Sequence, residues 1–160
     1  MKPLLYTGLV LGVVPIQTTV LDHLSVAGVR PDLCLVAACL IGFFGGLADG
    51  VLMGVLLGFE QDLFSAGDAW INLTTKAVIG LSAGVVGRYV ARATPVTVFP
   101  MVLGLSVCSG IAFLFAGAGG QGTLAAVRAV LLPQAMFDTA VGMGLYWILA
   151  ERFRKDDSLV

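Results

Sequence analysis

Hydrophobic residues in this chain form long, nearly uninterrupted runs that are separated by short polar or glycine-rich connections. Strands of a membrane barrel would alternate polar and apolar residues, whereas these runs are continuously apolar. The pattern therefore predicts six helices, over residues 4–20, 32–44, 46–64, 69–90, from 95 to the glycine-rich loop beginning at 116, and 131–151. Asp68 is the expected N-cap of the fourth helix, and a short interfacial turn is expected over residues 123–129.

Composition places these helices in lipid. Of 160 residues, 58% are hydrophobic and 12% are charged, and the mean hydropathy is +0.98. An ordinary soluble domain is about 45–50% apolar and about 25% charged, so a soluble fold of this size could not bury so much apolar surface. The sequence therefore predicts an all-α integral membrane protein with six transmembrane helices, in a single polytopic domain over residues 1–160. The second helix is short for a span and is expected to tilt into a thinned region or to be shielded by its neighbours.

Basic residues predict the orientation of the chain in the membrane. No small-residue cleavage site follows the first apolar run, so that run is expected to be a transmembrane helix and not a signal peptide. With the N-terminus inside, six basic residues lie on the cytoplasmic side and two lie outside, as the positive-inside rule requires. Both termini are therefore expected to be cytoplasmic. The inner set is Lys2, Arg88, Arg92, Arg152, Arg154 and Lys155, and the outer set is Arg30 and Arg128.

Glycines recur at every fourth position through the third predicted helix. Residues four apart share one helix face, and small residues allow the close backbone approach on which helix association in membranes depends. The spacing therefore predicts a helix-packing ridge, and it recurs in the first and fourth helices. Packing between this protein's own helices is the favoured interpretation; the alternative is that Gly8 and Gly12 receive a helix from a partner protein. The ridge consists of Gly46, Gly50, Gly54 and Gly58, and the repeats are Gly8 with Gly12 and Gly80 with Gly84.

Three ionisable residues fall in the outer halves of predicted spans, where a charge is costly and its default interpretation is functional. They are Asp62, Lys76 and Asp138, and they are expected to form one polar cluster with Asn72, Glu60 and Gln61. An internal ion pair that locks helices together is the favoured interpretation, with Asp138 as the expected partner of Lys76 because their depths match. A ligand or proton site is the alternative. On the cytoplasmic side, Asp49 is expected to pair with Arg88.

Signatures of catalysis are missing from the sequence. His23 is the only histidine and lies in a connection, and neither a metal-ligand cluster nor a phosphate-binding loop is present. Cys34, Cys39 and Cys108 lie within apolar runs and are expected to be small buried hydrophobic residues. The sequence therefore predicts a non-enzymatic protein with no cofactor, no metal and no nucleic-acid partner.

Several short motifs occur in an order that resembles the rod shape-determining MreD family. They are Gln17-Thr18, Pro31-Asp32-Leu33, the Gly54/Gly58 pair leading to Asp62-Leu63-Phe64-Ser65, and Asn72. The resemblance runs from about residue 17 to about residue 82. It implies a six-helix fold similar to the substrate-binding components of energy-coupling-factor transporters.

The same resemblance implies a non-enzymatic scaffold or assembly component of the bacterial cell-elongation complex. Its expected partner is an MreC-like single-span protein, with a RodA-like glycosyltransferase, a penicillin-binding transpeptidase and the MreB filament nearby and membrane lipid around it. The expected location is the bacterial cytoplasmic membrane. The alternative is the vitamin-binding component of an energy-coupling-factor transporter. Such a carrier needs a pocket with convergent polar groups, and helices four to six offer few of these, which favours the scaffold.

Overall fold

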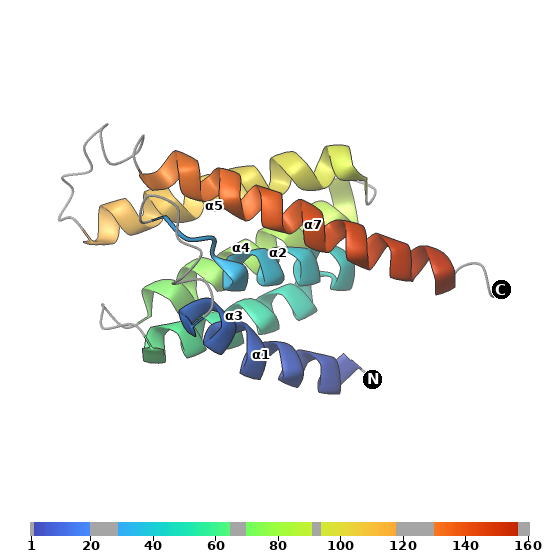
Figure 1. Ribbon diagram of the computed structural model, residues 1–160, viewed down its shortest axis with the longest axis horizontal. Helices are drawn as coiled ribbons and strands as arrows, with labels where there is room; N and C mark the ends of the chain where they lie inside the picture. The colour runs from blue at the N-terminus through green and yellow to red at the C-terminus, as the bar shows by residue number, and fades with distance from the viewer. Residues whose placement is uncertain (1, 20–28, 65–69, 91–93, 118–129, 157–160) are drawn as a thin grey trace.

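The computed structural model of the protein describes residues 2–19, 29–64, 70–90, 94–117 and 130–156 (Figure 1). These residues form six α-helices and one π-helical turn, with no strand among them. The predicted all-helical fold is therefore confirmed, and helix boundaries lie close to those expected. The elements are α1 (Lys2–Thr19), α2 (Leu33–Gly45), α3 (Leu47–Phe64), α4 (Ile71–Val85), η1 (Val86–Val90), α5 (Pro95–Gly117) and α7 (Leu132–Asp156).

Successive helices run back and forth along one long axis (Figure 1). The start of α1 and the end of α7 lie at the same end of the molecule, at the right of the figure, which we call the terminal end. At the opposite end, which we call the far end, α1, α3 and α5 finish and α2, α4 and α7 begin. Residues near these helix ends are thereby gathered in space although they are distant in sequence.

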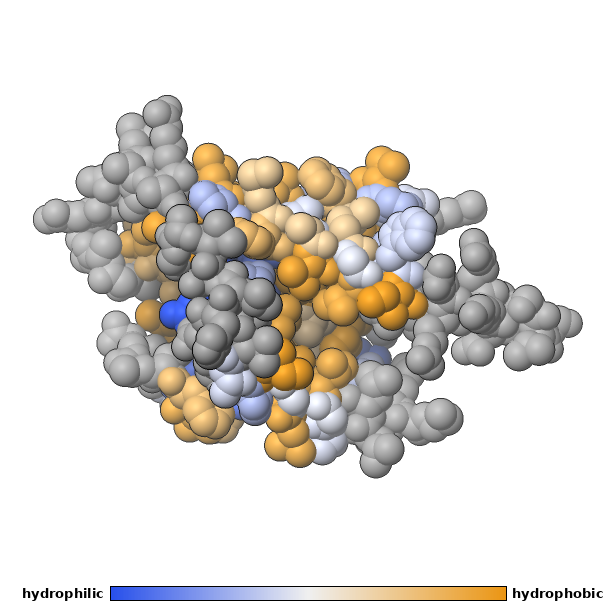
Figure 2. Space-filling model, viewed as in Figure 1, coloured by the Kyte–Doolittle hydropathy of each residue, from blue (hydrophilic) through white to orange (hydrophobic). Residues whose placement is uncertain are grey.

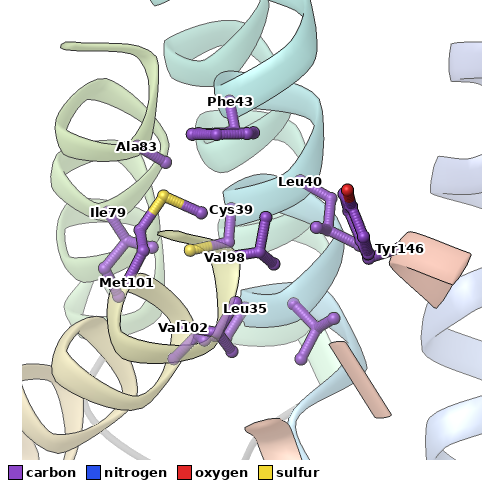
Figure 3. Close-up of a cluster of buried hydrophobic side chains, with 11 residues drawn as sticks. Leu35, Cys39, Leu40, Phe43, Ile79, Ala83, Val98, Met101, Val102 and Tyr146 are labelled. Carbon is purple, nitrogen blue, oxygen red and sulfur yellow. The ribbon is translucent and has the colours of Figure 1, made fainter. Parts of the chain in front are cut away.

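Helix α2 is the centre of the molecule. It has 13 residues, most of them buried, and contacts every other described helix. Figure 3 shows its side chains Leu35, Cys39, Leu40 and Phe43 packed among residues of α4, α5 and α7. Its short length is therefore explained by shielding from neighbouring helices, one of the two expected solutions. Cys34 and Cys39 are buried as predicted, whereas Cys108 is exposed.

The tightest packing joins α3 to α4 through glycine. A Cβ atom added to Gly54 would lie 2.7 Å from the carbonyl carbon of Lys76, and one added to Gly58 would lie 2.5 Å from Leu73 Cα. On Gly50 it would lie 2.7 Å from Gly42 Cα and would also meet the carbonyl of Gly80. Real side chains do not approach backbone so closely, so these positions need glycine. The favoured interpretation of internal packing is confirmed for these three ridge residues.

Gly46 does not belong to this packed ridge. It follows the last residue of α2 with φ +94°, and an added Cβ would meet nothing within 4 Å. The four-residue spacing predicted it as a helical residue, but the chain turns here between α2 and α3. Glycine is needed because a left-handed φ is strained for other residues.

Gly8 and Gly12 also meet nothing within 4 Å of an added Cβ. They therefore do not pack against this protein's own described helices, and the face of α1 that carries them is open. Nearby on α1, Leu11 and Ile16 are exposed. Reception of a partner helix at this face stays a prediction.

One described helix has both the length and the apolarity of a membrane span, over Pro95–Phe115 with mean hydropathy 2.2. Tyr6–Gln17 and Leu33–Gly45 are apolar but shorter. Helix α3 is long enough but carries three carboxylates, Asp49, Glu60 and Asp62, and α4 has 15 residues before it continues into η1. By length and composition alone, these helices are weak evidence for a membrane.

Some expected features lie outside the described residues. They are Asp68, the interfacial turn over residues 123–129, and the basic residues Arg92 and Arg128. The N-cap position of α4 is Trp70, with φ +83° and no capping bond from its own side chain. Among the described residues, the bonds that cap α4 come from Asp62 of α3.

Candidate functional site: a polar network and two cavities at the far end

Asp32 and Lys76 form an ion pair at the far end. Lys76 Nζ lies 2.9 Å from Asp32 Oδ2, and the Lys76 side chain is completely buried. The other Asp32 oxygen accepts a hydrogen bond from Leu35 N at 3.0 Å, which caps α2. Lys76 also donates to Asn72 Oδ1 at 2.9 Å, one helical turn before it on α4. The ammonium group is thus held by two oxygen atoms in the interior.

Asp138 joins this network through Asp32 and not through Lys76. Its Oδ1 accepts a hydrogen bond from Asp32 N at 2.6 Å, and its Oδ2 accepts one from the Ser106 hydroxyl. The predicted direct pair between Lys76 and Asp138 is therefore wrong. Matching depths along α4 and α7 suggested that pair, but the chain entering α2 lies between the two helices and places Asp32 there.

Asp62 caps α4 from the end of α3. Its two oxygens accept hydrogen bonds from the backbone N–H groups of Trp70 at 3.0 Å, Asn72 at 3.2 Å and Leu73 at 2.9 Å. They also accept one from Asn72 Nδ2 at 2.8 Å. A carboxylate is well suited to the first turn of a helix, where N–H groups lack partners and the helix dipole is positive. Asp62 therefore fixes the turn that begins α4 and holds the Asn72 side chain.

The predicted polar cluster of Asp62, Lys76 and Asp138 is therefore real, but its members are joined indirectly. Asn72 links Asp62 to Lys76, and Asp32 links Lys76 to Asp138. Glu60 and Gln61, expected in the same cluster, make no hydrogen bond to it. The network connects α2, α3, α4, α5 and α7, so it locks five helices together at one end.

At the terminal end, the expected ion pair of Asp49 with Arg88 is wrong. Asp49 Oδ2 accepts a hydrogen bond from the Tyr6 hydroxyl at 2.8 Å instead. Arg88 is exposed and lies 5.5 Å from the ring centre of Tyr89, and no ion pair joins it to Asp49 within the described residues. Asp49 of α3 therefore holds α1 through Tyr6.

Two adjoining cavities open beside the polar network. One of about 460 Å³, the α1-side cavity, lies among Gln17, Arg30 and Phe64. The other, of about 390 Å³, is the α5-side cavity and lies beside Asn72, Ser109 and Phe113. Both are lined by Asp32, Gln61, Val130 and Gln134. Helices four to six contribute only Asn72, Ser109 and Gln134 to the polar lining, and the other polar side chains come from α1, α3 and the segment before α2, which the expectation about helices four to six did not consider.

Polar atoms without partners occur in and near these cavities. Ser109 is 5% exposed and has no hydrogen-bond partner within the described part of the chain. Gln61 Oε1 is buried and equally unpaired, as is Glu60 Oε2 nearby in sequence. Buried polar groups are nearly always hydrogen-bonded, so unpaired ones beside a cavity indicate a place that water or a small molecule can fill.

The acidic side chains of the far end already have structural partners. Within the described ranges, no group of three or more His, Cys, Asp and Glu side chains is placed to hold a metal ion. The carboxylates of Asp32, Asp62 and Asp138 already hold backbone N–H groups or the lysine. The site is suited to holding helices and a small molecule together.

Residues that carry the resemblance to MreD proteins gather at the far end. Gln17 Oε1 accepts a hydrogen bond from Cys34 N at 3.3 Å and so ties α1 to α2, and Pro31 is buried beside Asp32. With Asp62 and Asn72 they form a connected region in space. Comparison of the chain with protein-family models, with curated proteins and with solved structures finds no match in any of the three.

Proposed function

We propose that this protein is a non-enzymatic membrane scaffold of the bacterial cell-elongation machinery, similar to MreD proteins. The observation that carries the proposal is an inverted distribution of polarity. Lys76 and Asp138 are completely buried, while large hydrophobic side chains are exposed on every described helix except α2. Figure 2 shows such side chains over the middle of one face. Water would not stabilise this arrangement, but lipid does.

In this proposal all six helices cross the bacterial cytoplasmic membrane, in a fold similar to the substrate-binding components of energy-coupling-factor transporters. The back-and-forth order of the helices supports it, because such an order places both ends of the chain on one side. The terminal end is the cytoplasmic end, and the far end with its polar network faces outward. Single helices too short for a full span are shielded by the bundle, as α2 is.

The partner proposed for α1 is an MreC-like single-span protein. Helix α1 lies at the edge of the bundle and packs mainly against α2 and α3. Gly8 and Gly12 leave its outer face open, and small residues allow two backbones to approach closely in lipid. A RodA-like glycosyltransferase, a penicillin-binding transpeptidase and the MreB filament are proposed as further members of the same assembly.

The test is co-purification of the tagged protein with the MreC-like protein from bacterial membranes. We expect Gly8→Leu and Gly12→Leu to reduce recovery of the partner by about tenfold or more, because a bulky side chain separates the helices. Gly104→Leu on α5 and Gly144→Leu on α7 are matched controls, because those glycines are equally open. Equal recovery with all four variants, at equal amounts of folded protein, would place the partner elsewhere.

A small-molecule carrier, the vitamin-binding component of an energy-coupling-factor transporter, is the second candidate. The two cavities at the far end favour it, because a carrier needs an enclosed space with a few polar groups. Mass spectrometry of protein purified from native membranes distinguishes the carrier from the scaffold. A bound vitamin together with a co-purified energising subunit would establish the carrier and exclude the scaffold as the main role.

A further inference from the structure

The structure assigns a binding site for a small, neutral, planar molecule with hydrogen-bonding groups to the α5-side cavity. Ser109, Gln61 and Phe113 are its defining side chains. The inference goes beyond the scaffold role, and it holds whether the bound molecule regulates a scaffold or is the cargo of a carrier. Unpaired polar atoms, the charges beside the cavity and the residues that line it support this assignment.

Hydrogen bonding at this site is incomplete in the protein alone. Ser109 lines the cavity and is 95% buried, and no hydrogen bond joins its side chain to another described residue. Gln61 lines the same cavity and has a buried, unpaired Oε1. A hydroxyl group both donates and accepts, and an amide offers an acceptor and two donors. A ligand that carries both donors and acceptors would therefore satisfy groups that the fold leaves unpaired.

The lysine beside the cavity already has its counter-charge. Lys76 is bound to Asp32 and Asn72, and the second oxygen of Asp32 is bound to Leu35 N. The remaining polar groups of the wall belong to serine, glutamine and asparagine side chains. An anionic ligand would lose its hydration without gaining a free positive charge, and it would lie near the carboxylates of Asp32 and Asp138. The site therefore selects a neutral molecule over its anionic analogue.

The remaining wall is apolar and contains an aromatic ring. Phe113, Leu114, Val130 and Leu131 line the α5-side cavity, and Gly110 leaves part of the wall without a side chain. Aromatic side chains favour flat partners that stack on or against the ring. With a volume of about 390 Å³, the cavity is within the usual range for small-molecule sites but near its lower end. These features favour a compact planar ligand.

Water is the competing occupant, because a polar cavity of this size can hold ordered water. A ligand-binding site and a water-filled cavity differ in a measurable way. A site built for a ligand discriminates between neutral and charged molecules of equal shape, and its affinity falls when a polar wall group is removed. A water-filled gap does neither.

The experiment uses ligand-detected saturation-transfer NMR with the full chain in lipid nanodiscs. The probes are nicotinamide and benzamide, each neutral and planar, with nicotinate and benzoate as their negatively charged counterparts. We expect binding of at least one neutral probe and none, or about tenfold weaker binding, for its charged counterpart. No binding by any neutral probe, or equal binding of neutral and charged probes, would overturn the assignment.

Variants place the bound probe at the site. Ser109→Ala is expected to weaken binding about three- to tenfold, the usual effect of one lost hydrogen bond between neutral groups. Cys108→Ala is the matched control, because this neighbouring residue on α5 is exposed. Gln61→Met is expected to weaken binding while raising the unfolding temperature, because it removes an unpaired buried oxygen. Binding unchanged in both Ser109→Ala and Gln61→Met would overturn the assignment. Co-purification of the MreC-like partner is a separate readout, so failure here leaves the scaffold proposal standing.

Discussion

Asp32 is the residue on which the far end depends. Its side chain caps α2 and neutralises Lys76, and its backbone N–H donates to Asp138. It therefore connects three helices within one residue. Pro31 directly before it is buried and has no backbone N–H to donate.

The Lys76–Asp32 pair gives a prediction for stability. We expect Lys76→Met to lower the free energy of unfolding by about 3–5 kcal/mol, because it leaves a buried carboxylate without its partner. Asp32→Asn keeps an oxygen suitable for capping α2, and the double variant is expected to recover part of the loss. Denaturation of the four proteins in detergent completes a double-mutant cycle. Strictly additive losses would contradict the pair.

A second prediction concerns the cap that Asp62 provides for α4. Asp62→Ala removes four hydrogen bonds that hold the start of α4. Bonds to a charged acceptor contribute about 1.5–3 kcal/mol each, so we expect a loss of at least about 2 kcal/mol in the free energy of unfolding, with a smaller loss for Asp62→Asn. The neighbouring exposed Leu63 provides the control, as Leu63→Ala. Equal losses for Asp62→Ala and Leu63→Ala would show that the cap is unimportant.

Sequence reasoning found the buried charges but not their pairing. Lys76 and Asp138 were identifiable because a charge within an apolar run needs a partner. The partner itself depends on how α2 enters the bundle, and that is decided by tertiary packing and not by depth along each helix. Asp32 was noted only through the family resemblance, although an acid directly before an apolar helix is also an N-cap signal. The cavities could not be predicted, since their walls come from five separate helices and a connecting segment.

At the scale of elements, the four-residue glycine spacing was a strong predictor. It identified Gly50, Gly54 and Gly58 as packing positions, because periodicity along a helix fixes which residues share a face. It failed at Gly46, where the helix had not yet begun, and it could not distinguish packed faces from the open face of α1. Helix boundaries were close because apolar runs, caps and prolines are local signals.

Substitution of one packed glycine and one open glycine tests whether glycine is needed where α3 meets α4. Gly54→Ala would place a Cβ 2.9 Å from Ala77 Cα and closer still to the Lys76 carbonyl, and overpacking of this kind typically costs about 1–3 kcal/mol. Gly8→Ala meets nothing and should be neutral or stabilising, since alanine is favoured over glycine in helices by about 1 kcal/mol. Thermal unfolding in detergent compares the two. Equal unfolding temperatures for both variants would show that α3 and α4 separate easily.

For the whole molecule, the distribution of polar and apolar side chains between the interior and the surface favours a lipid environment. The interior holds an ion pair, a second aspartate and several hydroxyl groups, while the outer surface is rich in exposed leucine, isoleucine, valine and aromatic side chains. Length and hydropathy of single helices identify one span only. The bundle as a whole is better suited to lipid than its single helices, because α2 is buried and two of the three carboxylates of α3, Asp49 and Asp62, are bonded within the bundle.

Reporter fusions can test the proposed orientation of the chain across the membrane. The start of α1 and the end of α7 share the terminal end, and the excess of basic residues there predicts a cytoplasmic location. A green fluorescent protein fused after Val160 should fluoresce, and alkaline phosphatase at the same position should be inactive, because each works on one side only. Fusions after Gly117, at the end of α5, should give the opposite result, since that residue lies at the far end. Active phosphatase after Val160 would reverse the orientation, and equal signals at both positions would show that α7 does not cross the membrane.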